Sequence, residues 1–153
     1  VGLGYNYRTD EIRASLGRVQ LNRLPANNEK RAQITTRYWR ELAGSGLGLP
    51  FKQIAGDAHI RPAYHIMPVM LPAGIDRQAF IDQLRQAGIQ TSIHYPPIHR
   101  FSYHRQRYPG SELPQTELAA SREVTLPLFP GMLEAQFDLV IESVSNALDS
   151  QGK

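Results

Sequence analysis

Two consecutive prolines, Pro96 and Pro97, constrain the fold of this chain more than any other feature of its sequence. They end a stretch in which apolar and polar residues alternate as in a β-strand, and neither proline can donate a backbone N–H to a neighbouring strand. Each proline also fixes its own φ at about −65° and pushes the preceding residue out of the helical region. The segment from Tyr95 to Ile98 is therefore predicted to be a stiff, extended turn at the end of a strand.

This turn carries four polar or aromatic side chains, those of His94, Tyr95, His99 and Arg100. A stiff turn that already holds two imidazoles, a phenol and a guanidinium near one another loses little conformational entropy when a ligand binds. The turn is therefore a candidate polar binding site. The alternative is a proline-rich surface loop whose polar side chains are simply hydrated.

Composition and charge narrow the class of protein. With 153 residues, of which 41% are hydrophobic and 20% charged, the chain can bury one core of the ordinary globular kind. Its formal net charge is +3 and its basic residues form no run, which argues against a nucleic-acid-binding surface. No apolar run of the sequence approaches the roughly 20 residues that span a bilayer, so we expect no membrane segment.

The chain contains no cysteine, which excludes disulfides and thiolate metal sites. This composition suits a reducing compartment, and we expect a cytoplasmic protein. The sequence begins at Val1 without an initiator methionine or a signal-peptide pattern, and we expect it to be part of a longer protein.

Apolar periodicity predicts two helices at the start of the chain. The first is expected to be capped by Thr9 or Asp10 and to end at Pro25, and the second to begin at Asn27 or Asn28, so that the two form an αα-hairpin. The apolar residues at helical spacing are Ile12, Leu16, Val19 and Leu24 in the first helix and Ile34, Tyr38 and Leu42 in the second.

Further along, short strands alternate with helices. Strands are predicted for residues 63–71, with Pro68 at an edge or a bulge, and for residues 89–94 and 124–126. Asp76 is expected to cap a helix that ends at Gly88, and a short helix is expected from Pro114 to Arg122 with Leu118 facing inward. The last helix has one apolar face, formed by Phe137, Ile141, Val144 and Leu148. The predicted class is α/β, with a small sheet covered by helices.

The residues that could carry chemistry alone do not cluster in the sequence. The five histidines are His59, His65, His94, His99 and His104, without a His-x-x-x-His pair or a neighbouring carboxylate cluster, and we predict no metal site. Ser92 and Ser102 lack the strand–turn–helix glycine context of a nucleophile. The three lysines are Lys30, Lys52 and Lys153, and none lies in an apolar stretch that would favour a Schiff base. No catalytic residue is assigned.

Five blocks of sequence, in the same order and at similar spacing, resemble the DegT/DnrJ/StrS-type sugar aminotransferases. They are Gly4-Tyr5-Asn6-Tyr7-Arg8-Thr9-Asp10 with Ala14-Ser15-Leu16-Gly17 and Gln20-Leu21, then Tyr64-His65, Gly88-Ile89, His94-Tyr95-Pro96-Pro97-Ile98-His99 and Thr125-Leu126-Pro127-Leu128-Phe129-Pro130. The resemblance extends from Gly2 to about Leu148. Thr9 departs from it, because methionine is common at that position.

The resemblance implies a fold, a reaction and a cofactor. These enzymes have the fold-type-I architecture of aspartate aminotransferase, act as homodimers and use pyridoxal 5′-phosphate (PLP) to move an amino group, usually from glutamate, to a keto group of a nucleotide-linked sugar. This chain resembles their C-terminal part. Residues 1–25 would be the cofactor loop and connecting helix, and residues 26–153 the α+β small domain.

The resemblance also implies roles for individual residues. Asn6 and Arg8 match positions that reach the cofactor phosphate of the other subunit, for which an amide and a guanidinium are suited. A turn residue that tolerates positive φ is the alternative for Asn6. His94, Tyr95 and His99 match the loop on the sugar-nucleotide side, and we add Arg100 as a candidate contact to the diphosphate.

The catalytic lysine, the cofactor-stacking aromatic residue and the pyridinium-pairing aspartate of these enzymes precede the matched blocks and have no counterpart here. The resemblance therefore implies a chain that is inactive alone. The alternative is a stand-alone sugar-nucleotide-binding or assembly module without catalysis.

Overall fold

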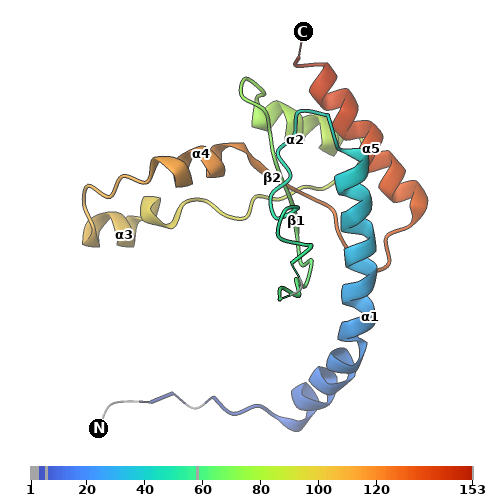
Figure 1. Cartoon of the computed structure of the whole chain (residues 1–153). Coiled ribbons are helices and arrows are strands. Elements are labelled where there is room, and N and C mark those ends of the chain that lie inside the picture. Colours follow the sequence, from blue (N-terminus) through green and yellow to red (C-terminus); the bar gives the residue numbers. More distant parts are fainter. Residues whose placement is uncertain (1–3, 6, 58, 153) are drawn as a thin grey trace.

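The computed structural model describes residues 4–5, 7–57 and 59–152 of the chain. Its elements, in chain order, are α1 (Glu11–Glu41), β1 (Met67–Met70), α2 (Arg77–Gln86), the 3-10 helix η1 (Ile98–Arg100), α3 (Ser102–Arg107), α4 (Pro114–Arg122), β2 (Glu123–Leu126) and α5 (Glu134–Asp149). In Figure 1 the C-terminal half of α1 together with α2 and α5 surrounds the two strands, and we call this unit the body. Helices α3 and α4 lie on a projection from it, the arm (residues 97–122). The predicted α/β class, with helices around a small sheet, is confirmed.

Helix α1 is continuous over 31 residues, with Pro25 in its interior. Asp10 caps its N-terminus as predicted and accepts a hydrogen bond from the backbone N–H of Arg13 at 2.8 Å. The predicted break at Pro25 and the αα-hairpin are wrong, because Asn27 and Asn28 lie inside the helix. Pro25 removes one helical hydrogen bond, and Figure 1 shows α1 changing direction along its length without ending.

A buried tyrosine anchors the C-terminal half of α1 to the body. Tyr38 is fully buried, its hydroxyl donates to the carbonyl oxygen of Pro127 at 2.9 Å, and its ring packs on Phe137 with centroids 4.7 Å apart. Burial raises the pKa of the Tyr38 phenol above its ordinary value. Arg37 lies over the Phe137 ring at 4.2 Å and pairs with Glu134 at 2.8 Å. This anchoring explains why the proline bends the helix instead of ending it.

The sheet is a two-stranded antiparallel ladder in which Pro68 of β1 lies opposite Thr125 of β2. Thr125 exchanges both of its backbone hydrogen bonds with Ser92, at 2.8 and 3.2 Å, on the side away from β1. The Pro68–Thr125 pair is therefore not hydrogen-bonded, so the missing N–H of Pro68 costs no ladder bond. The strand predicted for residues 89–94 is reduced to this single bridge at Ser92, because the chain reaches the proline turn before it can pair further.

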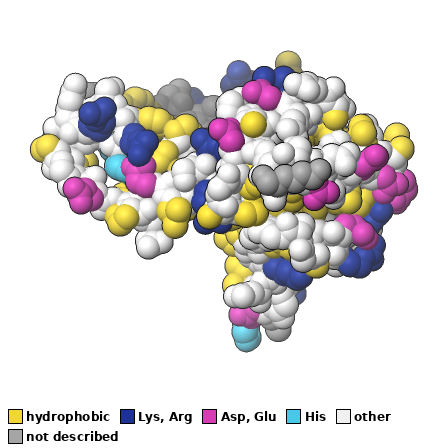
Figure 2. All heavy atoms as spheres, turned by 90° about the horizontal axis from the view of Figure 1, so that it is seen from above, with side chains coloured by type: hydrophobic (Ala, Val, Ile, Leu, Met, Phe, Trp, Pro, Cys, Tyr) yellow, Lys and Arg dark blue, Asp and Glu magenta, His cyan; other side chains and the backbone are white. Residues whose placement is uncertain are grey.

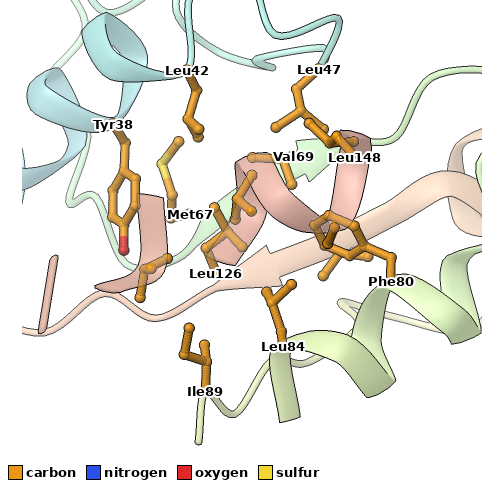
Figure 3. Packing of buried hydrophobic residues seen from close by; sticks show 14 of the residues in the cluster. Tyr38, Leu42, Leu47, Met67, Val69, Phe80, Leu84, Ile89, Leu126 and Leu148 are labelled. Atoms are coloured by element: carbon orange, nitrogen blue, oxygen red, sulfur yellow. The ribbon is translucent and has the colours of Figure 1, made fainter. Parts of the chain in front are cut away.

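Helices α2 and α5 pack over the ladder. Asp76 caps α2 through the N–H of Ala79 at 2.8 Å, and Gly88 ends it with a φ of 79°. The helix end predicted at Gly88 is thus confirmed, and the N–H of Ile89 bonds to the carbonyl of Leu84 at 2.9 Å, which completes a Schellman motif. Figure 3 shows how the core side chains from α1, β1, α2 and β2 meet. The apolar face predicted for α5 is confirmed by its buried residues, which are Phe137, Val140, Val144, Ala147 and Leu148.

The arm contains no buried residue in η1, α3 or α4. The bounds predicted for α4 are confirmed, but the inward orientation of Leu118 is wrong, because its side chain is 51% exposed and α4 has no buried residue. Polar contacts fix the base of the arm. The guanidinium of Arg77 donates to the carbonyl of Ala120, and Nε of Arg122 donates to the carbonyl of Leu71 at 2.6 Å. Among the described residues no helix is long and apolar enough to cross a membrane.

Candidate functional site

The proline turn predicted from the sequence connects the body to the arm. After the bridge at Ser92 the chain passes through the cis peptide bond between His94 and Tyr95 and enters η1. Pro97 precedes η1, and its carbonyl accepts the N–H of Arg100 at 3.0 Å. The turn therefore places His94 beside the sheet and directs His99 and Arg100 toward the arm.

A carboxylate from α4 holds the arm end of this turn. Oε1 of Glu117 lies 2.5 Å from Nε2 of His99 and accepts a hydrogen bond from Nε of Arg100 at 2.7 Å, while a second guanidinium nitrogen bonds its other oxygen. The hydrogen bond from Arg100 lowers the pKa of the Glu117 carboxyl below its ordinary value, and His99 acts in the same direction. Glu117 thus links the turn to α4, and Figure 2 shows basic, acidic and histidine side chains gathered on the arm.

The sheet end of the turn is held by β2. The backbone N–H of His94 donates to Oε2 of Glu123 at 2.9 Å, and the ring Nδ1 of His94 lies 2.9 Å from Oγ1 of Thr125. The hydroxyl of Thr125 donates in turn to Oε1 of Glu123, whose residue is only 8% exposed. His94 is therefore fixed through both its backbone and its ring.

A broad, open cavity of about 1480 Å³ is lined mostly by residues of the arm. Its lining includes three arginines, Arg77, Arg100 and Arg105, and two carboxylates, Glu112 and Glu117. His99 also lines it, with a side chain that is 14% exposed. With more guanidinium than carboxylate groups, the cavity is suited to an anion.

The structure brings together only some of the residues predicted for the site. His99 and Arg100 line the cavity, whereas His94 and Tyr95 are not part of its lining. The rings of His94 and Tyr95 contact each other with centroids 4.8 Å apart, and Tyr95 is 72% exposed. Arg8 is exposed in the segment before α1, and Asn6 lies outside the described residues.

Sequence reasoning missed Glu117, Glu123, Thr125 and Arg77. Glu117, Glu123 and Thr125 form hydrogen bonds with turn residues that lie 17 to 31 positions away in the sequence. No local sequence pattern marks pairs at such separations. Glu123 gave one usable signal, because it is a charged residue that begins a short apolar strand. A carboxylate in such a place is buried only when it has hydrogen-bond partners.

Within the described ranges no three His, Asp or Glu side chains gather as metal ligands do. The two described lysines that were considered as Schiff-base candidates lie at exposed positions. Lys30 is exposed on α1, and Nζ of Lys52 bonds to the carbonyl of Trp39 at 3.4 Å in an exposed loop. Neither amine has the apolar surroundings that favour a Schiff base.

The model of the DegT/DnrJ/EryC1/StrS aminotransferase family matches residues 1–145. The chain belongs to this family. The resemblance of the five sequence blocks is thereby confirmed.

Solved structures agree with this membership. The aminotransferase PseC of Helicobacter pylori, involved in the biosynthesis of pseudoaminic acid, superposes with a TM-score of 0.87 and 22% identity over 98% of this chain and 40% of its own, which shows the fold. DesV of S. venezuelae, solved in complex with a ketimine intermediate, superposes with a TM-score of 0.82 and 29% identity over 93% of this chain and 37% of its own. The PLP form of the putative sugar aminotransferase Spr1654 of Streptococcus pneumoniae superposes with a TM-score of 0.80 and 26% identity over 94% of this chain and 36% of its own. The chain thus spans less than half the length of these relatives.

The family and these neighbours confirm pyridoxal phosphate as the cofactor of the intact enzyme. The fold of this chain corresponds to a portion of the aminotransferase fold, as predicted.

Proposed function

We propose that this chain is the C-terminal part of an aminotransferase that moves an amino group, from glutamate, to a keto group of a nucleotide-linked sugar, and that it is inactive alone. Family membership and the 36–40% of each relative that it covers support this assignment. The cofactor supplies the electron sink for moving the amino group. The residues of this chain bind and orient the sugar nucleotide.

The observation that carries the proposal is the cavity with three arginines in its lining, where Glu117 holds the side chains of His99 and Arg100 in place. A guanidinium has five N–H donors, and Glu117 takes two of those on Arg100, so donors remain for a diphosphate. Glu117 also holds Arg100 in place before the ligand arrives, which reduces the entropy lost on binding. We assign Arg100, with Arg77 and Arg105, to the diphosphate.

The remaining assignments follow the family match. His94, Tyr95 and His99 would contact the sugar end of the substrate. Asn6 and Arg8 would reach the cofactor phosphate bound in the other subunit of a homodimer, from a unit formed by residues 1–25. The apolar side chains on the first half of α1 support this division, since Ile12 is 83% and Leu16 61% exposed.

A binding measurement on Arg100 tests the proposal. In the full-length protein that carries residues 1–153, a panel of nucleoside diphosphates (UDP, GDP, CDP and dTDP) is titrated by calorimetry. We expect Arg100→Ala to weaken the diphosphate that binds by about 10- to 100-fold, the usual worth of a charged hydrogen bond. Arg40→Ala is the matched control, because Arg40 is equally exposed, pairs with Glu41 at 2.8 Å and lies outside the cavity. Equal affinities in both variants would contradict the assigned role.

A stand-alone binding or assembly module is the second candidate, and one observation favours it. The buried cluster of the body draws on α1, both strands, α2 and α5 of this chain. The intact mass of the natural product in its source cells separates the candidates. A mass near 17.2 kDa would support the module, and a mass roughly two to three times larger, usual for a two-domain enzyme, would support the aminotransferase.

A further inference from the structure

The side chains of Glu123 and Thr125 form a hydrogen-bonded relay to His94 that the proposed binding role does not use. Both residues lie on β2, and at a spacing of two they point to the same face of the strand. Val124 and Leu126 point to the other face, where they join the apolar core. The relay therefore lies on the side of the strand away from the core, next to the segment that carries His94.

The direction of each hydrogen bond can be assigned. A backbone N–H can only donate, so Oε2 of Glu123 accepts from the N–H of His94 at 2.9 Å. The single hydroxyl proton of Thr125 is donated to Oε1 of Glu123. Oγ1 of Thr125 then has only lone pairs to offer to the imidazole nitrogen that lies 2.9 Å away. Nδ1 of His94 must therefore carry a proton and donate it to Thr125.

The consequence concerns the other ring nitrogen. In a neutral imidazole one nitrogen is a donor and the other an acceptor. With the proton held on Nδ1, the lone pair belongs to Nε2, and no hydrogen bond to Nε2 is made by any of the described residues. Histidines in binding sites commonly have their tautomer set in this way by the partner of the second nitrogen.

We propose that Glu123 and Thr125 are positioning residues that hold His94 as its Nδ1–H tautomer, so that Nε2 accepts a hydrogen bond from a sugar hydroxyl of the substrate. The ligand contact rests on the proposed function, whereas the tautomer rests on the geometry alone. The two parts can therefore fail separately.

Nitrogen-15 NMR of the histidine rings in the full-length protein tests the tautomer. The protonated and unprotonated nitrogens of a neutral imidazole have well-separated shifts, and we expect Nδ1 of His94 to be the protonated one. Thr125→Val removes the hydroxyl at nearly constant shape and should shift the ring toward the Nε2–H tautomer. Thr125→Ser restores the hydroxyl and should restore the wild-type spectrum. A wild-type ring protonated on Nε2, or a spectrum unchanged in Thr125→Val, would overturn the relay.

A buried threonine outside the relay provides the control. Thr35 is 2% exposed against 5% for Thr125, and its hydroxyl has no hydrogen-bond partner among the described residues. Thr35→Val should leave the His94 spectrum unchanged. If Thr125→Val does not fold, Glu123→Gln replaces it. Its amide NH2 cannot accept one of the two hydrogen bonds now made to the carboxylate, so the same tautomer shift is expected.

The ligand contact is tested by comparing two probes of the same base. With the glucose conjugate of whichever diphosphate binds (UDP-, GDP-, CDP- or dTDP-glucose), we expect Thr125→Val to weaken binding about fivefold to tenfold, while the diphosphate alone binds unchanged. Equal losses for both probes would overturn the sugar contact and leave the relay as a structural feature. If no nucleotide binds even to the wild type, the proposed function fails, and with it the contact to a sugar, while the NMR result decides the tautomer independently.

Discussion

The body and the arm of this molecule are held together by different forces. The body buries a continuous apolar cluster in which residues such as Val69, Phe80 and Leu84 have no exposed surface. The arm buries no side chain of its helices, and its order depends on the hydrogen bonds and ion pairs around Glu117 and Arg77. Apolar burial supplies most of the stability of a fold, whereas exposed ion pairs supply little.

This difference suggests that the body and the arm have different roles. A rigid body fixes the sheet end of the proline turn through Ser92 and His94, and a weakly packed arm presents the arginine-lined cavity. Substitutions of the core side chains of the body should therefore change global stability, and substitutions in the arm should change binding and local order. Each of the following predictions tests this separation.

The largest expected effect comes from one substitution made in both regions. Leu84→Ala in α2 removes a fully buried side chain and should lower the free energy of unfolding by about 2–5 kcal/mol. Leu118→Ala in α4 removes a side chain that is 51% exposed and should change it by no more than about 0.5 kcal/mol. Urea unfolding followed by circular dichroism measures both. Similar losses in the two variants would show that the arm is part of the cooperative core.

Local signals in the sequence predicted much of the body. The caps of α2 at Asp76 and Gly88, and the buried face of α5, depend on residues within a few positions of one another. Helix caps are set by local backbone hydrogen bonding, and a helix face is set by the roughly 3.6-residue spacing of apolar residues. Both signals can be read directly from the sequence. They were predicted correctly for that reason.

The errors arose where tertiary contacts decide. The rule that proline ends a helix failed at Pro25, because Tyr38 and its neighbours anchor α1 beyond it. The apolar period of the first half of α1 predicted the helix correctly, but the period does not say what covers the apolar side chains, and Ile12 and Leu16 are exposed. Leu118 was predicted to face inward because it is apolar, but apolar character alone does not provide a surface for it to pack against.

The sequence predicted the turn of the candidate site but not the residues that hold the turn in place. The turn from His94 to Arg100 was visible in the sequence because its residues are contiguous and its prolines stiffen it. Its partners Glu117, Glu123 and Thr125 come from α4 and β2, which fold back only in the tertiary structure. Spacing along the chain contains no information about which carboxylate will meet a given imidazole.

A smaller effect is expected from a polar contact within the body. Tyr38→Phe removes the hydroxyl that donates to the carbonyl of Pro127 and leaves that carbonyl without its partner, at a cost of about 1 kcal/mol. The midpoint of urea unfolding should fall accordingly, with the m-value unchanged. Tyr64→Phe is the control, since that hydroxyl makes no hydrogen bond to any described residue. Equal shifts in both variants would mean that the bond to Pro127 contributes nothing.

The smallest effect on global stability is expected at Glu117, where the change should be confined to the arm. Arg100 holds the folded pKa of this carboxyl below its ordinary value of 4.5, so its contribution is complete above pH 4.5 and is lost as the pH falls through the lower folded pKa. When the pH is lowered from neutral to below 4.5, the amide NMR signals of η1 and α4 should therefore move or broaden, while those of α2 do not. Glu117→Gln should abolish this pH-dependent change in the η1 and α4 signals, with little change in the unfolding midpoint. A pH step of equal size in α2, or one that persists in Glu117→Gln, would show that arm and body do not respond separately.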